Sequence, residues 1–194
     1  MRPYDRLRPT AIEIMERLDA YGVELDDQGV HVMTSPVNRH ELATSRLQRQ
    51  LQPQLASGML AHAGTAEIDD PITGRMRKPD LVVIPEAALE RPGETYLRPA
   101  DVELVAEVVS EPNPDNDYER KTVDYPAMGI PTYMIIDPRK STVTVFSGPA
   151  RGPDGMRYRV RHDYVFGDEV TAGGYTIDSG RFLPYEDAET SNER

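Results

Sequence analysis

Residues 104–136 read LVAEVVSEPNPDNDYERKTVDYPAMGIPTYMII, and this stretch decides the fold. It begins with the apolar run 104–109 and ends with the apolar run 133–136, both short and rich in β-branched residues. Such runs are typical of strands that are buried on both faces of a sheet. Residues 117–128 between them favour a helix, so the stretch predicts a strand–helix–strand crossover unit.

The segments on either side extend this unit into one α/β domain. A third apolar run at 81–84 predicts another buried strand. Toward the N-terminus, the spacing of apolar residues predicts helices at 9–20 and from Asn38, with a β-hairpin formed by 23–25 and 30–33 between them. After residue 138 the pattern alternates, which predicts antiparallel strands at 142–146, 157–160, 164–170 and 175–177.

We therefore expect a central mixed β-sheet flanked by helices, with a β-rich C-terminal part. A single domain is expected to span residues 1–185, because neither an internal repeat nor a linker interrupts the pattern. Residues 186–194 are acidic and polar, and they are expected to form a disordered tail.

Composition narrows the classes of function. The chain has 194 residues and no cysteine, which excludes disulfides and thiolate metal sites. It contains no apolar run of the roughly 20 residues that a membrane span needs, so we expect a cytoplasmic protein without a membrane partner. The formal net charge is −11, so any basic surface for nucleic acid has to be local.

Two carboxylates interrupt the predicted buried strands. Asp80 lies at the entrance of the strand at 81–84, and Glu107 lies within the strand at 104–109. A buried carboxylate is costly unless it is paired or binds a cation, and two that converge can hold Mg²⁺, which prefers oxygen ligands. The alternatives are a turn or capping role for Asp80 and an arginine partner for Glu107.

The predicted helix at 117–128 presents Asp117, Lys121 and Tyr125 at intervals of four residues, so they share one face. One interpretation is a solvated face with an Asp–Lys pair. The other is that Lys121 leans over the sheet toward Glu107, where its charge would stabilise charge that develops on phosphorus.

The chain resembles the Uma-type restriction endonuclease family in three motifs that occur in the family's order. These motifs are RKPDLVVIP at 77–85, VAEVVSEP at 105–112 and NDYERKTVDYPAMGIPTYMIIDP at 116–138. That family belongs to the PD-(D/E)xK nuclease superfamily. The resemblance implies a restriction-endonuclease-like core, with Asp80 and Glu107 as metal ligands. The backbone carbonyl of Val108 is a further ligand that the resemblance allows.

The same resemblance assigns the remaining site residues. The usual superfamily lysine would fall at position 109, which is valine here, and Lys121 matches a lysine displaced to the following helix. Asp117 and Tyr125 would support Lys121 and the sheet around it. Many nucleases of the superfamily carry an acidic residue on the first core helix, and Glu41, with His40 beside it, is the candidate.

Arg75, Arg77 and Lys78 precede the strand that begins after Asp80, and Arg120 lies beside Lys121. These residues either contact a phosphate backbone or simply flank a sheet edge.

The first hypothesis is a Mg²⁺-dependent endonuclease that hydrolyses the phosphodiester bonds of nucleic acid, with DNA as the substrate, Mn²⁺ as a substitute and a homodimer as the assembly. The second is a non-catalytic binding or oligomerisation module on a nuclease-like fold. The net charge of −11 favours the second hypothesis, and an intact triad favours the first.

Overall fold

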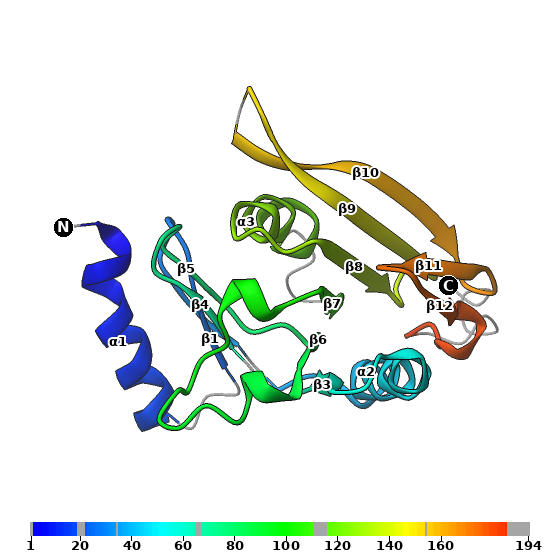
Figure 1. Ribbon diagram of the computed structural model, residues 1–194, viewed down its shortest axis with the longest axis horizontal. Helices are drawn as coiled ribbons and strands as arrows, with labels where there is room; N and C mark the ends of the chain where they lie inside the picture. The colour runs from blue at the N-terminus through cyan, green and yellow to red at the C-terminus, as the bar shows by residue number, and fades with distance from the viewer. Residues whose placement is uncertain are drawn as a thin grey trace, which may run out of the picture.

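The computed structural model describes residues 2–18, 22–33, 35–64, 67–110, 116–153 and 155–185. The predicted acidic tail at 186–194 lies outside these residues. A six-stranded mixed sheet forms the centre of the molecule (Figure 1). Its strands in spatial order are β10 (Gly155–Val165), β9 (Thr142–Gly152), β8 (Thr132–Asp137), β7 (Leu104–Val108), β6 (Leu81–Pro85) and β3 (Met59–Ala63).

The predicted crossover unit is confirmed in the middle of this sheet. Strands β7 and β8 are parallel, with Glu107 beside Ile135, whereas β6 runs antiparallel to β7. The connection contains a π-helical turn (Asn116–Arg120) followed by α3 (Lys121–Ala127). Gly129 ends the helix with φ of +80°, a conformation that glycine adopts without steric cost, and the chain turns there into β8.

Helices cover both faces of the sheet. The helix predicted from Asn38 is α2 (Asn38–Leu51), and its Leu47 and Leu51 pack with Ala106 and Val108 on one face. On the opposite face, Tyr125 of α3 joins a second apolar cluster with the alternate residues of β7 and β8. Glu107 has the parity of this second face, because successive side chains of a strand point to opposite sides.

A separate sheet joins the N-terminal hairpin to two short strands from residues 68–77. Its strands are β1 (Gly22–Leu25), β2 (Val30–Met33), β4 (Ile68–Asp70) and β5 (Arg75–Arg77), in the spatial order β2-β1-β5-β4. The predicted hairpin is confirmed as β1 (Gly22–Leu25) and β2 (Val30–Met33). Strands β4 (Ile68–Asp70) and β5 (Arg75–Arg77) were not predicted, because each has three residues and is mostly polar. The first helix, α1 (Pro3–Leu18), starts earlier than the predicted 9–20 and packs against β1.

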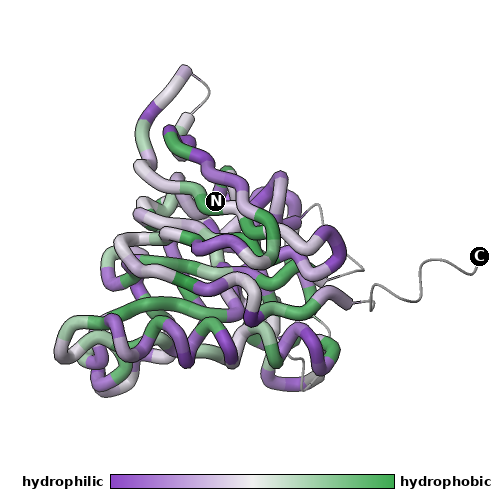
Figure 2. Tube along the Cα trace, turned by 90° about the vertical axis from the view of Figure 1, so that its right-hand side faces the viewer, coloured by the Kyte–Doolittle hydropathy of each residue, from purple (hydrophilic) through white to green (hydrophobic). Residues whose placement is uncertain are grey.

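The C-terminal part is β-rich as predicted, but its strands are longer. The predicted strands at 142–146 and 157–160 are parts of the 11-residue strands β9 and β10, which form a hairpin that projects beyond the body of the molecule (Figures 1 and 2). The predicted strand at 164–170 is divided between the end of β10 and a separate strand that begins at Glu169. Strands β11 (Glu169–Ala172) and β12 (Tyr175–Asp178) form a small hairpin beside α2. Short 3₁₀ turns occupy Gln52–Gln54, Glu86–Ala88, Pro99–Asp101 and Ser179–Arg181. Among the described residues, no helix is long and apolar enough to cross a membrane.

Candidate active site

Asp80 lies immediately before β6 and faces the first turn of α2. Its Oδ2 accepts a hydrogen bond of 2.7 Å from the backbone N–H of Val108 and lies 3.1 Å from His40 Nε2. The Asp80 residue is only 9% exposed. Two segments that are far from Asp80 in the sequence therefore hold its carboxylate in place.

Glu107 lies in the middle of β7 and is buried. The ammonium of Lys121 is 2.9 Å from Glu107 Oε1, and the Tyr125 hydroxyl donates a hydrogen bond to the same oxygen. The sequence interpretation in which Lys121 leans toward Glu107 is the one that the structure shows. Lys121 is also buried, so the solvated-face interpretation of this helix is wrong.

The four-residue spacing of Asp117, Lys121 and Tyr125 places all three at one point, as predicted. Asp117 Oδ1 lies 3.0 Å from Lys121 Nζ. Asp117 precedes α3 in the π-helical turn, and its backbone carbonyl accepts a hydrogen bond of 3.0 Å from the Tyr133 hydroxyl on β8. This bond ties the turn to the sheet.

Glu24 is a site residue that the sequence interpretation missed. It lies on β1, is 1% exposed, and its Oε1 is 3.4 Å from Lys121 Nζ. Its other oxygen accepts hydrogen bonds from Asn116 at 3.2 Å and from Arg77 at 3.0 Å. The signal was present in Val23-Glu24-Leu25, a carboxylate between two apolar strand residues, which is the same pattern that identified Glu107.

The family match decides the classification. The sequence profile of the Uma2 family, described as "Putative restriction endonuclease", matches residues 11–174 of this 194-residue chain. The chain belongs to the Uma2 family. It is also similar to the crystal structure of a "putative nuclease belonging to DUF820" from Anabaena variabilis ATCC 29413.

That likeness covers 84% of this chain and 90% of the other, with a TM-score of 0.62 and 13% sequence identity, so it shows a shared fold. A comparison with curated proteins finds no match. The Uma2 profile and the nuclease-like fold together support a nuclease function, and they confirm the restriction-endonuclease-like core that the resemblance implied.

Arg75 and Arg77, for which the sequence left open a phosphate contact or a position at a sheet edge, both pair with carboxylates. Arg77 is fully buried, and its guanidinium pairs with Glu24, Asp26 and Asp124. A phosphate contact would require it to leave three carboxylates. Arg75 also pairs with Asp124.

Lys78 and Arg120 differ in exposure. Lys78 is buried, with its backbone N–H 3.4 Å from Glu24 Oε1. Arg120 is half-buried and lies against the ring of His31 on β2. Of these two residues, Arg120 is the one with part of its surface open to solvent.

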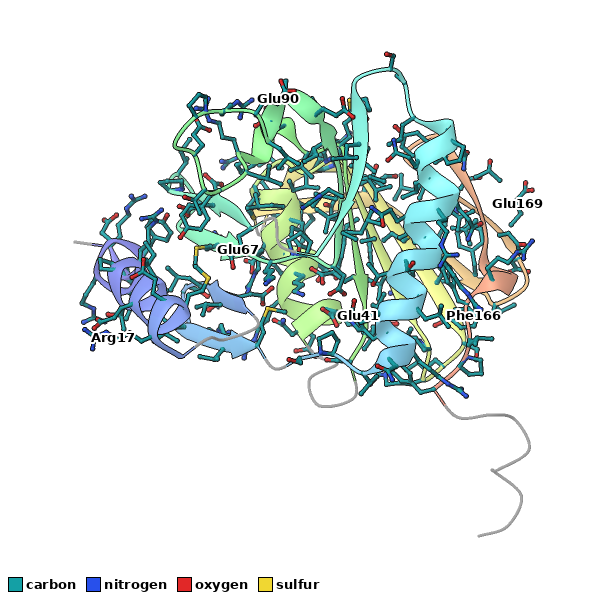
Figure 3. The ribbon with its side chains drawn as sticks, turned by 90° about the horizontal axis from the view of Figure 1, so that it is seen from below. Arg17, Glu41, Glu67, Glu90, Phe166 and Glu169 are labelled. Carbon is teal, nitrogen blue, oxygen red and sulfur yellow. The ribbon has the colours of Figure 1, made fainter. Side chains whose placement is uncertain are left out.

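His40 and Glu41, the two candidate site residues at the start of α2, differ in how far they are exposed. His40 is buried against Asp80, and its Nδ1 has no hydrogen-bond partner among the described residues. The Glu41 side chain is 55% exposed and lies on the side of α2 that faces α3 (Figure 3). Glu41 lines a pocket of about 100 Å³ with Asp80, Thr44, Ala63 and Gly64. Glu41 thus shares a small pocket with Asp80, the expected metal ligand.

Burial and crowding shift the pKa values of these groups. Burial, reinforced by Asp80 and Asp117, raises the pKa of Glu107 well above its usual range, against the lowering effect of Lys121. Burial alone would lower the pKa of Lys121, but Asp117 and Glu107 outweigh it and raise that pKa. Lys121 is therefore a permanent cation at neutral pH.

The donor set fits a hard divalent cation of the kind that nucleases with this fold generally use. Asp80 uses Oδ2 and Glu107 uses Oε1 for their contacts, and no described residue forms a hydrogen bond with Asp80 Oδ1 or Glu107 Oε2. No three His, Asp or Glu side chains in the described part of the chain are arranged as a complete metal site. Two oxygen donors are sufficient for Mg²⁺, which retains several waters.

Proposed function

We propose that this Uma2 protein is a divalent-metal-dependent endonuclease that hydrolyses phosphodiester bonds of nucleic acid, with DNA as the substrate. The observation that carries the proposal is the convergence of Asp80, Glu107 and Lys121 from three separate segments, with Lys121 Nζ 2.9 Å from Glu107 Oε1. Two carboxylates and a permanent cation are the groups that phosphodiester hydrolysis needs.

In this proposal Asp80 and Glu107 hold Mg²⁺ or Mn²⁺, and the carbonyl of Val108 is a further donor. When bound, the cation supplies Lewis-acid stabilisation of charge on the phosphoryl oxygens. Val108 N–H and His40 fix one oxygen of Asp80, which leaves the other available. Tyr125 fixes Glu107 in the same way.

The proposed role of Lys121 is electrostatic. Its ammonium is held by Asp117 and Glu107, so it is oriented before any substrate arrives. A preorganised cation in a buried site stabilises negative charge that develops on the phosphoryl group more strongly than the same cation in water. Glu24 and Asp117 act through Lys121 and are positioning residues.

The test combines calorimetry and cleavage. Titration with MnCl₂ should show binding to the wild type and not to Asp80→Asn. Cleavage of labelled single- and double-stranded DNA with Mg²⁺ should fall about 100-fold or more in both Asp80→Asn and Lys121→Met. Glu119→Gln is the matched control for Asp80→Asn, because Glu119 is exposed beside Lys121 and its neutralisation changes the net charge by the same amount and in the same direction.

Cleavage that persists unchanged in Asp80→Asn or Lys121→Met would contradict the proposal and identify a contaminant. A Glu119→Gln protein that loses activity to the same extent would show that only net charge near the helix matters.

A second candidate function is a non-catalytic nuclease-like module that works through binding or oligomerisation. The net charge of −11 and the burial of Arg77 favour it, since both reduce the basic surface available to a polyanion. A well-folded wild type that binds neither Mg²⁺ nor Mn²⁺ in the calorimeter would support this candidate over the endonuclease.

A further inference from the structure

The projecting β9–β10 hairpin concentrates positive charge. It carries Arg151, Arg157, Arg159 and Arg161, which we name the arginine arm. Between residues 151 and 161 the sequence holds these four arginines and one acidic residue, Asp154. The whole chain has 22 lysines and arginines against 33 aspartates and glutamates, so the arm reverses the charge of the rest.

The arm's guanidinium groups are accessible. Arg151, Arg157 and Arg159 are exposed, and none of the three has an ion-pair partner among the described residues. The Arg157 guanidinium donates a hydrogen bond of 2.8 Å to the neighbouring Met156 carbonyl. Arg161 differs, since it pairs with Asp163 at 3.0 Å and lies over the Phe146 ring. Three arginines of the arm are thus available to an external anion.

The backbone of the arm is anchored beside the helix that carries Lys121. The Tyr158 hydroxyl donates a hydrogen bond of 2.9 Å to the carbonyl of Ile130, which follows α3. The Tyr158 ring also packs against Phe146, with centroids 6.0 Å apart. The arginines therefore project from a fixed platform next to α3, and a bound ligand does not have to order the strand.

Protection of a sheet edge explains the arm only in part. Strand β10 is an edge of the central sheet, and edge strands use charged side chains, lysine especially, to avoid pairing with other chains. Lysine does not occur between residues 151 and 161, and all four basic residues are arginines. Arginine is the residue that binds phosphate through two parallel hydrogen bonds, so the composition fits a phosphate ligand better than edge protection.

The spacing suits a chain of phosphates. Arg157, Arg159 and Arg161 alternate along β10, and residues two apart in a strand are about 6.7 Å apart along its axis. The guanidinium groups of Arg157 and Arg159, which have no ion-pair partner among the described residues, can therefore each contact a separate phosphate of a polyanion. A second copy of β10 is disfavoured as the partner, because pairing two such strands would bring arginines against arginines.

We infer that the arginine arm binds the phosphate backbone of the nucleic-acid substrate, outside the catalytic group of Asp80, Glu107 and Lys121. This inference rests on the proposed endonuclease function. The arginine arm explains how a protein with a net charge of −11 can bind a polyanion, because the positive surface that binding requires is confined to one projecting hairpin.

The test is the salt dependence of binding to a fluorescein-labelled DNA duplex, followed by anisotropy with EDTA present so that no cleavage occurs. In Arg157→Gln/Arg159→Gln, affinity should fall about tenfold, and the slope of log Kd against log salt should decrease by about 2. Arg157→Lys/Arg159→Lys should retain most of the slope. Manganese binding should be unchanged in both variants, which reports that the site at Asp80 is intact.

The matched control is Arg6→Gln/Arg17→Gln on α1, which removes the same charge from exposed positions. Equal losses in the control and arm variants would overturn the inference in favour of a general charge effect. An unchanged slope in the arm variant, with wild-type cleavage intact, would overturn it without affecting the proposed function. A wild type that neither binds nor cleaves would overturn both. An arm variant that loses a dimer in sedimentation but keeps its slope would assign the arm to self-association.

Discussion

Lys121 is held by carboxylates from three separate parts of the chain. Asp117 precedes it by one helical turn, Glu107 lies on β7 of the central sheet, and Glu24 comes from the N-terminal hairpin. Because removing one partner of a buried ion pair leaves an uncompensated charge, each of these carboxylates affects both stability and the orientation of the ammonium.

The first prediction concerns Glu24. Glu24→Gln keeps the shape of the side chain but removes one charge between Lys121 and Arg77, so the ammonium loses one of its three orienting partners. We expect kcat for DNA cleavage to fall about tenfold to 100-fold, with KM and manganese affinity unchanged. Steady-state kinetics and calorimetry measure these values.

The control for Glu24→Gln is Glu169→Gln, an exposed glutamate on β11 (Figure 3). A purely structural role for Glu24 would lower the melting temperature and the fraction of active enzyme without changing kcat per active site. That result would contradict the prediction.

The second prediction concerns Asp26. Burial would raise its pKa, but hydrogen bonds from His31 and Arg77 outweigh burial and lower the pKa to about 2. A lowered carboxyl pKa gives stability that is present above the unfolded-state pKa and is lost as pH falls through the folded-state value. We expect Asp26→Asn to reduce the free energy of unfolding by about 2 kcal/mol at pH 6.

Urea unfolding at several pH values tests this prediction. The difference between wild type and Asp26→Asn should shrink steadily from pH 5 to pH 3, because Asp26 takes up a proton in the unfolded chain at a higher pH than in the folded protein. A difference that stays constant over this range would show that ionisation of Asp26 does not contribute to stability.

At the scale of elements, the crossover β7–α3–β8 positions two of the three proposed catalytic residues. Its strands were predicted because their apolar runs are unambiguous. The helix was predicted as one segment at 117–128, whereas the structure divides it into a π-helical turn and a short α-helix that contains Pro126. The spacing of four residues survives this division, because the side chains of Asp117 and Lys121 still meet at 3.0 Å.

The third prediction concerns the end of this crossover. Gly129 has φ of +80°, and a Cβ added there would meet no atom within 4 Å, so the cost of alanine is conformational. Gly129→Ala should lower the free energy of unfolding by about 1 kcal/mol, and Gly129→Asn should cost less because asparagine tolerates this conformation. Equal stability of Gly129→Ala and the wild type in urea unfolding would exclude strain at this turn.

At the scale of the whole molecule, net charge is the dominant feature. With a formal charge of −11 the folded state repels itself, and added salt screens this repulsion. The fourth prediction is that the melting temperature at pH 7 rises when NaCl increases from about 10 mM to about 200 mM. The rise should disappear near pH 4.8, the isoelectric point of the sequence. Differential scanning calorimetry measures both, and an equal rise at the two pH values would indicate a salt effect unrelated to net charge.

The homodimer expected from the sequence stays a prediction at this scale, and sedimentation velocity at micromolar concentration checks it.

The sequence by itself predicted five of the six strands of the central sheet, all but β3, and it singled out Asp80 and Glu107, whereas Lys121 joined the proposed triad mainly through the family resemblance. Apolar runs specify buried strands through hydrophobic burial alone, which is a local property. For the same reason, Asp80 and Glu107 stood out as charges where burial is costly.

Only the tertiary structure decided the partners of these groups. Glu24 reaches Lys121 because the N-terminal hairpin folds over the crossover, and Arg77 is withdrawn from the surface by three carboxylates from distant segments. The length of the β9–β10 hairpin was equally hidden, because the mostly exposed side chains of its outer half leave no apolar pattern in the sequence. Ion pairs between residues about 50 to 100 positions apart depend on the folded chain, and no periodicity in the sequence encodes them.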